Sequence, residues 1–180
     1  MATIKDFTYK PLDTNLTLNP NEDLNNKVVL IVNVDSAWGW TKPTYEELNV
    51  LHTKYADQGL VIITQPNNQF NLGTPREPLD GQELLDFINM TFEPKWKFIL
   101  EKADVKGKNI TELYQFLINH KNTRGTFGNQ IKWSFTKFLC DKDGVPRYRF
   151  GSSDSPLKFE KKIQKLLGEI SSKTIQTDQC

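Results

Sequence analysis

The residues of this chain whose types and spacing suit chemistry lie in a short loop, residues 35–41, with the sequence Asp-Ser-Ala-Trp-Gly-Trp-Thr. A continuous apolar run at 28–34 precedes the loop, and a segment with apolar residues at three-to-four spacing follows it. The first turn of a helix presents free N–H groups and a positive dipole end, which stabilise an anion. Loops between a buried strand and a helix are also where α/β proteins place many sites. The pattern therefore predicts a site at 35–41, with Thr41 as the helix N-cap and Pro43 in the first turn.

The elements that must position this loop follow an α/β pattern. The run 28–34 is typical of a strand buried on both faces, and it forms a βαβ unit with a helix at 44–58, ended by Gly59, and a strand at 60–63. Alternating apolar and polar residues at 4–18 predict an N-terminal β-hairpin. Further helices are expected at 82–92, 110–120 and 156–168, and further strands at 131–140 and 145–150, joined by a hairpin turn. This order predicts a central mixed β-sheet with helices on both faces.

Length, charge and cysteine content narrow the class of protein. The 180 residues suit a single domain over 1–180 with a frayed polar tail at about 169–180. Lys and Arg, 23 together, nearly balance 22 Asp and Glu, which argues against binding to nucleic acid or an anionic membrane surface. We find neither an apolar run that could span a membrane nor an N-terminal signal peptide, and two cysteines do not make a disulfide framework. A cytoplasmic protein is therefore expected.

Three ordered blocks of the sequence resemble the glutathione peroxidase family. The block 65–71 is similar to F-P-C-N-Q-F-G, and the block 133–139 is similar to W-N-F-x-K-F-L. The resemblance runs in register from about residue 4 to 167. It implies a thioredoxin-like fold and hydroperoxide reduction with glutathione or thioredoxin as the reductant, without a bound cofactor or metal. The first block resembles V-N-V-A-S-x-Cys/Sec-G-x-T and matches it at Asn33, Val34, Ser36, Gly39, Thr41, Tyr45 and Leu48.

The peroxidatic position of the family is occupied here by Trp38. Peroxide reduction needs a thiolate or selenolate that attacks an O–O bond and is oxidised, and an indole has neither the acidity nor the redox cycle for this step. By the resemblance, Gln69 and Trp133 correspond to the residues that hydrogen-bond the chalcogen, and Ser134 stands where the family has asparagine. We expect Trp38, Gln69 and Trp133 to converge, because each lies at or just past the end of a strand of one sheet. Gln69 and Trp133 also suit purely structural roles in packing and hydrogen bonding.

Other departures from the family pattern surround the same position. Asp35 replaces an alanine and places a negative charge where an anionic nucleophile would be destabilised, although it also suits a plain turn. Asn67 replaces the cysteine of the second block, and Ile88 is the counterpart of the resolving cysteine that cysteine-type members often carry. Cys140 lies in an apolar strand pattern and is expected to be inert.

Three functional hypotheses remain open at this point. The first is a peroxidase-like protein without peroxidase chemistry, a pseudoenzyme with a binding or regulatory role, in which Trp38 and Trp40 plug the vacant site or form a platform for a protein partner. The second is a genuine glutathione- or thioredoxin-dependent peroxidase in oxidative-stress defence, in which Trp38 is an engineered substitution or a UGA selenocysteine codon read as tryptophan. The third places a redox role at Cys140, Cys180 or a tryptophan radical. The short connection at 121–130 favours a monomer.

Overall fold

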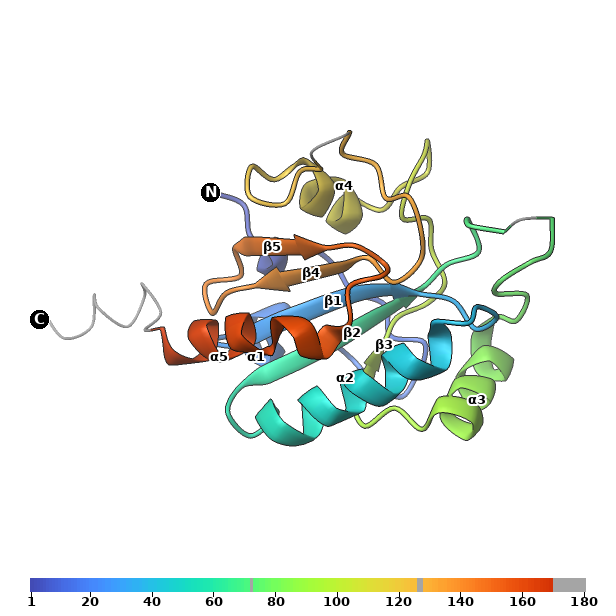
Figure 1. The fold of residues 1–180 in the computed structure, drawn as a ribbon, viewed down its shortest axis with the longest axis horizontal. Helices are drawn as coiled ribbons and strands as arrows, with labels where there is room; N and C mark the ends of the chain where they lie inside the picture. Colours follow the sequence, from blue (N-terminus) through green and yellow to red (C-terminus); the bar gives the residue numbers. More distant parts are fainter. Residues whose placement is uncertain (72, 126–127, 170–180) are drawn as a thin grey trace, which may run out of the picture.

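The computed structural model describes residues 1–71, 73–125 and 128–169, and this part of the chain contains a mixed five-stranded sheet (Figure 1). The strands lie in the order β3-β2-β1-β4-β5. The first three strands are parallel, whereas β4 is antiparallel to both β1 and β5. Their bounds are Val28–Val34 (β1), Leu60–Pro66 (β2), Phe98–Ile99 (β3), Lys137–Cys140 (β4) and Pro146–Phe150 (β5). The predicted mixed sheet is confirmed, and its central strand is the apolar run that precedes the loop 35–41.

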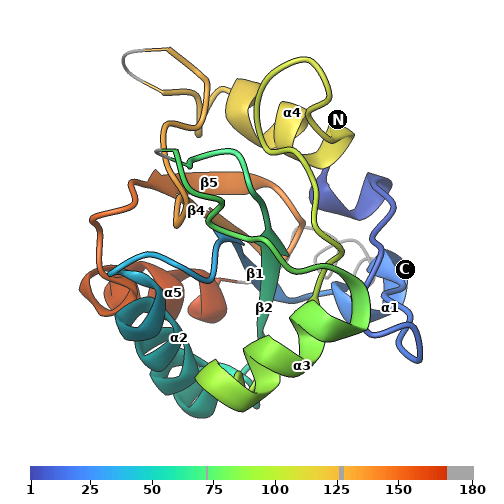
Figure 2. The same cartoon turned by 90° about the vertical axis from the view of Figure 1, so that its right-hand side faces the viewer.

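Helices cover both faces of this sheet, as Figure 2 shows in a view turned by 90°. Side chains alternate between the faces along β1, so that Leu30 and Val32 enter one hydrophobic cluster, while Val29 and Ile31 enter another. Because both faces are buried, the strand is apolar throughout. The first cluster is covered by α2 (Thr41–Tyr55), α3 (Gly81–Phe92), the 3₁₀ helix η2 (Pro156–Phe159) and α5 (Glu160–Gly168), and the second by α4 (Glu112–Asn119) and the N-terminal segment with η1 (Ile4–Asp6) and α1 (Pro20–Asp23).

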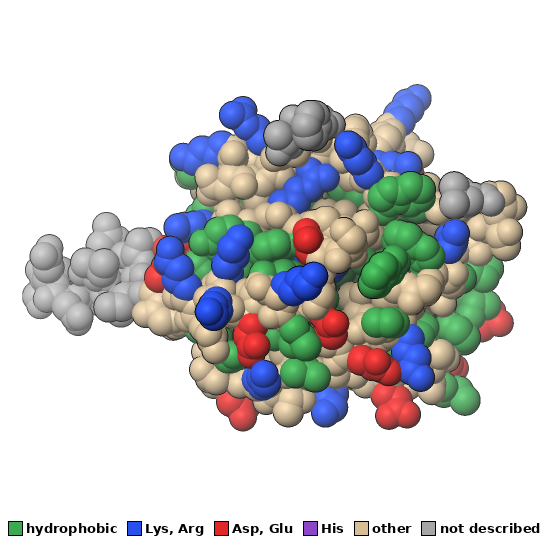
Figure 3. Space-filling model, in the orientation of Figure 1, with side chains coloured by type: hydrophobic (Ala, Val, Ile, Leu, Met, Phe, Trp, Pro, Cys, Tyr) green, Lys and Arg blue, Asp and Glu red, His purple; other side chains and the backbone are tan. Residues whose placement is uncertain are grey.

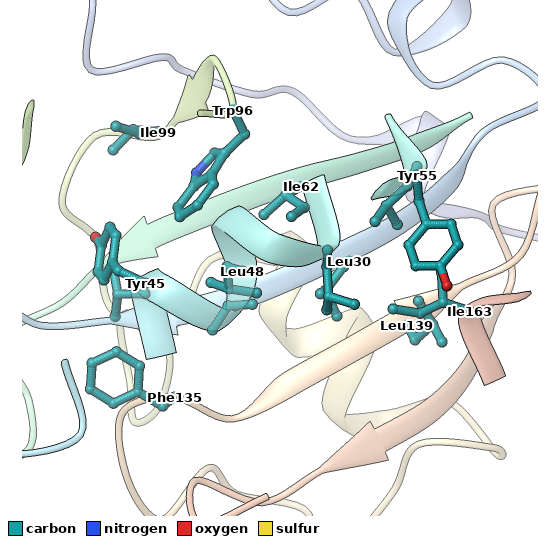
Figure 4. Close-up of a cluster of buried hydrophobic side chains, with 14 of the residues drawn as sticks. Leu30, Tyr45, Leu48, Tyr55, Ile62, Trp96, Ile99, Phe135, Leu139 and Ile163 are labelled. Carbon is teal, nitrogen blue, oxygen red and sulfur yellow. The ribbon is translucent and has the colours of Figure 1, made fainter. Parts of the chain in front are cut away.

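The first cluster fixes α2 on the sheet (Figure 4). Leu48 of α2 lies over Leu30 of β1 and Ile62 of β2, and each of these side chains is at most 1% exposed. Tyr45, in the second turn of the helix, is also buried and stacks on Trp96 with ring centroids 5.4 Å apart. The start of α2, which directly follows the loop 35–41, is thereby anchored to the core.

The start of α2 differs in detail from the prediction. Thr41 is the first helical residue rather than the N-cap, and the N-cap is Trp40, which makes no side-chain capping bond. The Thr41 hydroxyl instead closes the preceding loop, because it accepts a hydrogen bond from the Trp38 N–H at 3.1 Å and donates one to the Asp35 carbonyl at 3.0 Å. Gly59 does not end the helix directly. It lies in the turn between α2 and β2 with a φ of 106°.

The strand predicted at 131–140 is wrong in its first half. Only Lys137–Cys140 pairs as β4, and residues 133–136 form a turn in which Phe135 has a φ of 67°. Asn33 of β1 holds this turn: its amide donates to the Trp133 carbonyl at 3.3 Å and its carbonyl accepts from the Thr136 N–H at 2.9 Å. The chain therefore bends where the apolar pattern alone would continue the strand.

The predicted N-terminal hairpin at 4–18 is also wrong. Residues 4–6 form the short helix η1, which begins with a reciprocal capping box between Thr3 and Asp6. Farther along, Pro11 pairs with Leu100 as an isolated antiparallel bridge rather than with a neighbouring strand. The Leu12 N–H donates to the Ile99 carbonyl and the Glu101 N–H donates to the Lys10 carbonyl, both at 2.8 Å, so that one hydrogen bond lies on each side of Pro11. The predicted tail at about 169–180 lies, apart from its first residue, outside the described residues.

Candidate functional site

Aromatic side chains gather where three strands end at one edge of the sheet. Trp38 follows β1, Phe70 follows β2, and Trp133 and Phe135 precede β4, which runs in the opposite direction. The Trp38 ring lies 5.9 Å from the Trp133 ring and 6.2 Å from Phe135, and Phe70 lies 6.3 Å from Trp133, centroid to centroid. Apolar side chains are visible over the β1–α2 loop and the segment that enters β4 (Figure 3). The predicted convergence of Trp38 and Trp133 is therefore present as direct ring contact.

Trp38 is packed into this group rather than free in solvent. Its indole is half-buried and lies against Phe135, which is fully buried in the first hydrophobic cluster. The guanidinium of Arg76 lies over the Trp38 ring, 6.0 Å from its centroid. This arrangement favours cation–π attraction. Trp133 remains 41% exposed. The position that the resemblance assigns to the nucleophile is thus filled by an apolar side chain held on several sides.

Trp40 lies in a different environment from Trp38. It is 50% exposed and lines a small hollow of about 40 Å³ together with residues 152–156 and the first turns of α2. A platform built from both indoles is therefore not what this structure presents.

The side-chain amide of Gln69 forms hydrogen bonds with the backbone of a neighbouring loop. Its Oε1 accepts from the N–H groups of Val105 and Lys106 at 2.7 and 3.0 Å, and its Nε2 donates to the Lys106 carbonyl at 3.0 Å. These three bonds fix the segment after β3 to the end of β2. The hydrogen-bonding role toward the indole position that the resemblance implied is thus replaced by a structural one, although the adjacent Phe70 does contact Trp133.

Three of the departures from the family pattern meet at the strand ends beside the loop that carries Trp38. Asn67, Ser134 and Asp35 are 0%, 1% and 2% exposed. The Asn67 amide donates to the Val34 carbonyl at 3.0 Å and to the Ser134 hydroxyl at 3.4 Å. The Ser134 hydroxyl in turn faces the Asp35 carboxyl and lowers its pKa against the larger, opposite effect of burial. Residues from three separate blocks thus form one buried polar cluster.

The expected negative charge at Asp35 is weakened by its surroundings. Burial raises the pKa of Asp35, while Ser134, the Ala37 N–H, Arg76 and Thr41 lower it to a smaller extent. Within the described part of the chain, one carboxyl oxygen, Oδ1, has no hydrogen-bond partner. A buried carboxyl in this state favours the neutral form more than a turn residue at the surface would.

Glu77 is a second buried carboxyl at this site, and the sequence patterns did not single it out. It is 0% exposed, its Oε2 accepts from the Ser36 hydroxyl at 2.7 Å, and its Oε1 has no partner. Burial raises the pKa of Glu77 to about 7, Asp35 and Asp80 add to the rise, and Ser36 and Lys102 oppose it. A Glu-Pro pair in a polar loop carries no periodicity that would predict burial. Only the fold brings it beside residue 35.

Among the described residues, the free cysteine is Cys140, and it does not lie at the site. Cys140 lies in β4, is 0% exposed, and has a pKa raised by burial and, to a smaller extent, by Asp141, which agrees with the prediction of an inert thiol. Cys180 lies outside the described residues. Ile88, at the position of the resolving cysteine, is buried in α3. No group of three or more His, Cys, Asp or Glu side chains that could hold a metal occurs within the described residues.

Solved structures place the fold in a known class. GPX1 of T. cruzi superposes with a TM-score of 0.69 at 32% identity, and the match covers 93% of this chain and 97% of that one. A thiol:disulfide interchange protein of the thioredoxin family from Chlorobium tepidum superposes with a TM-score of 0.59 at 16% identity over 90% of this chain and 93% of that one. The chain is therefore a thioredoxin-like α/β protein.

Sequence comparison narrows this class to a family. The family profile described as "Glutathione peroxidase" matches residues 5–118. "Probable glutathione peroxidase 2" of Arabidopsis thaliana is 42% identical over 171 residues, 94% of this chain and 96% of the relative. "Probable phospholipid hydroperoxide glutathione peroxidase" of Citrus sinensis is 40% identical over 169 residues, 92% and 95% of the two chains. This chain belongs to the glutathione peroxidase family, whose reaction involves a hydroperoxide and a thiol reductant.

Proposed function

We propose that this chain is a glutathione peroxidase family member that has lost hydroperoxide reduction and that its former catalytic position serves binding or regulation. The observation that supports this proposal is the buried contact among Asp35, Asn67 and Ser134, in the segments that flank Trp38 and Trp133. A single substitution at the peroxidatic position would leave its surroundings as the family has them. Here the surroundings have changed together, and the changed side chains contact one another.

The chemistry of the side chains at the site supports the same conclusion. The groups near Trp38 are indoles, phenyl rings, carboxyls, an amide and hydroxyls, and none of these reduces an O–O bond by accepting oxygen as a thiolate does. Cys140 is in the sheet interior and kept protonated by burial. The half-buried indole of Trp38 also occupies the space over Phe135. We therefore infer that Trp38 acts as a plug and that any partner would meet the exposed face of Trp133 beside it.

The alternative proposal is an active seleno-peroxidase in which Trp38 stands for a selenocysteine codon read as tryptophan. Only the position of Trp38 supports it, because a misread codon leaves Asp35, Asn67 and Ser134 unexplained. The codon for residue 38 distinguishes the two proposals: TGG agrees with a natural tryptophan, and TGA agrees with selenocysteine. The monomeric state and the cytoplasmic location stay predictions. The helices within the described residues are each too short or too polar to cross a membrane.

The test is peroxidase turnover with hydrogen peroxide and a lipid hydroperoxide, with glutathione or thioredoxin as the reductant. The chain as it stands should show no turnover above background, because the nucleophile is missing. Trp38→Cys alone should restore little, because the buried Asp35 would raise the pKa of the new thiol and Ser134 is shorter than asparagine. Adding Asp35→Ala and Ser134→Asn should restore more, since less desolvated charge then opposes the thiolate.

A matched control is Trp40→Cys, which places a thiol two residues away on an exposed side chain. It should give no turnover. Turnover by the unmodified chain that survives replacement of Cys140 and Cys180 by serine would overturn the pseudoenzyme proposal. Full turnover by Trp38→Cys alone would show that the surroundings are intact and would favour the selenocysteine alternative.

A further inference from the structure

Two loops that are distant in sequence are fastened to each other beside Trp38. The Ser36 N–H donates to the Arg76 carbonyl at 3.2 Å, and Arg76 Nη1 donates to the Ala37 carbonyl at 3.2 Å. The Asn68 side chain accepts from the N–H groups of Arg76 and Glu77 at 2.9 and 3.1 Å and closes the second loop. The loop 35–41, which carries Trp38, is thus held against Arg76 and Glu77, which Asn68 holds in turn.

The fastening encloses the two carboxyl groups of Asp35 and Glu77. Both residues are at least 98% buried, and the side-chain bond that joins the loops, from the Ser36 hydroxyl to Glu77 Oε2, ends on one of them. Asp35 Oδ1 and Glu77 Oε1 are each left without a hydrogen-bond partner among the residues that the structure describes. A buried carboxylate oxygen that accepts no hydrogen bond lowers the stability of the folded state. A proton on one carboxyl removes its charge and gives it an O–H donor.

The other charged and titratable groups that face the pair do not neutralise it. Arg76 acts on Asp35 and stacks over Trp38. Lys102 acts on Glu77, but its ammonium group is bound by the Leu79 carbonyl at 2.8 Å and by Asp80 Oδ2 at 3.3 Å. Tyr45, on α2, has a pKa raised by burial and by both carboxyls, so that it stays neutral. Two ionised carboxyls would therefore repel each other in a site with little compensation.

We propose that Asp35 and Glu77 act as a proton-operated latch: a proton held on one of the two carboxyls keeps the loop 35–41 against Arg76 and Glu77, and ionisation of both carboxyls releases the loop that carries Trp38. Release would uncover the face of Phe135 on which Trp38 rests. The latch goes beyond the loss of peroxidase chemistry and does not depend on it. Because the pKa of Glu77 is about 7, the latch is closed below neutral pH and opens above it.

The test is ¹⁹F NMR of the full chain labelled with 5-fluorotryptophan, in which each tryptophan gives its own resonance and single Trp→Phe variants assign them. The Trp38 resonance should titrate with a midpoint near pH 7. The Trp96 resonance should stay fixed, because Trp96 is buried and donates to the Thr64 hydroxyl. Asp35→Asn should lower the midpoint by about one pH unit through the lost repulsion. Glu77→Gln should abolish the transition above pH 6.

The control is Glu83→Gln, the same chemical change at an exposed carboxyl in the first turn of α3, and it should leave the midpoint unchanged. An unchanged Trp96 resonance verifies that each variant is folded. A transition that survives in the Asp35→Asn/Glu77→Gln double variant, which keeps both histidines, would overturn the proposal. So would a Trp38 resonance that does not titrate between pH 5 and 9, or closure at pH 8 that magnesium or calcium alone restores, since a cation rather than a proton would then hold the loops.

Discussion

Two sites with buried ionisable side chains, one at Lys137 and the other at Asp35 and Glu77, differ in how completely these side chains are hydrogen-bonded. Lys137, in β4, is 0% exposed, and its ammonium group finds a carbonyl for each of its three N–H bonds. Asp35 and Glu77 are buried as deeply, but each keeps one oxygen without a partner. The carbonyls that Lys137 Nζ meets, at 3.1, 3.1 and 2.7 Å, belong to Gly151, Ser152 and Asp154.

The contrast separates a structural charge from a responsive one. A fully satisfied buried charge ties segments together and has no better arrangement to adopt. A carboxyl pair with two unpaired oxygens has an incomplete set of bonds, which a proton or a movement of the loops can change. The incomplete site is the one that lies beside the former catalytic position.

The two sites also respond to pH in opposite directions. Burial lowers the pKa of Lys137 from 10.5 to about 8, while Asp154 and Glu47 oppose this effect. The unfolded chain then binds more protons than the folded one between pH 8 and 10.5, and this contribution to stability rises with pH. Glu77 has a folded pKa above its ordinary 4.5, so the folded chain binds more protons between about pH 4.5 and 7. Its contribution is fully favourable below that window and is lost as the pH rises through it.

The largest effect is expected at Lys137. Lys137→Met should lower the free energy of unfolding by on the order of 3 kcal/mol, because the carbonyls of Gly151, Ser152 and Asp154 lose the ammonium group that ties them to β4. Urea denaturation at pH 7 measures this loss. The control Lys158→Met, at an exposed lysine of η2, should change stability by about 0.5 kcal/mol or less. A loss below about 1 kcal/mol at Lys137 would mean that water replaces the ammonium group and that the two buried sites do not differ as described.

A smaller effect, with a defined pH dependence, is expected at Glu77. Glu77→Gln should leave stability little changed at pH 5 and raise it at pH 8, relative to the unmodified chain, by on the order of 2 kcal/mol, because it removes a buried charge that forms only above neutral pH. Urea midpoints at the two pH values give the difference. Glu83→Gln should show the same pH dependence as the unmodified chain. A Glu77→Gln variant that loses stability equally at both pH values would indicate a packing role without titration.

The smallest effect is expected at Ser36, whose hydroxyl links the loops. Ser36→Ala removes one hydrogen bond to a carboxyl and should cost about 1 kcal/mol at pH 5, where the latch is closed. Because this bond joins the two loops in the closed form, the variant should also shift the Trp38 transition to lower pH in the ¹⁹F titration. The exposed Ser153→Ala serves as the control. A shift to higher pH would contradict the role of Ser36 in holding the loops together and would leave only its effect on the pKa of Glu77.

Local patterns in the sequence predicted most of the elements. The strand at 28–34 and the helix at 82–92 were predicted correctly. In both segments the arrangement of apolar residues is typical of the element, and turn residues bound it. The sequence also indicated the family, because three short blocks resemble its motifs in the same order. The profile match over residues 5–118 confirms the family. The position of Trp38 at the end of β1 followed from the same two signals.

The arrangement of the site was decided by tertiary contacts. Asn33 bends residues 133–136 out of the strand that their apolar pattern predicts, and Gln69 turns its amide to residues 105–106. Asp35 and Glu77 are 42 positions apart in the chain, so no period or spacing connects them. They meet because β1 and β2 are parallel neighbours whose ends lie at one edge of the sheet. Their unpaired oxygens, and the proton that we propose on one of them, exist only because the fold removes both groups from water.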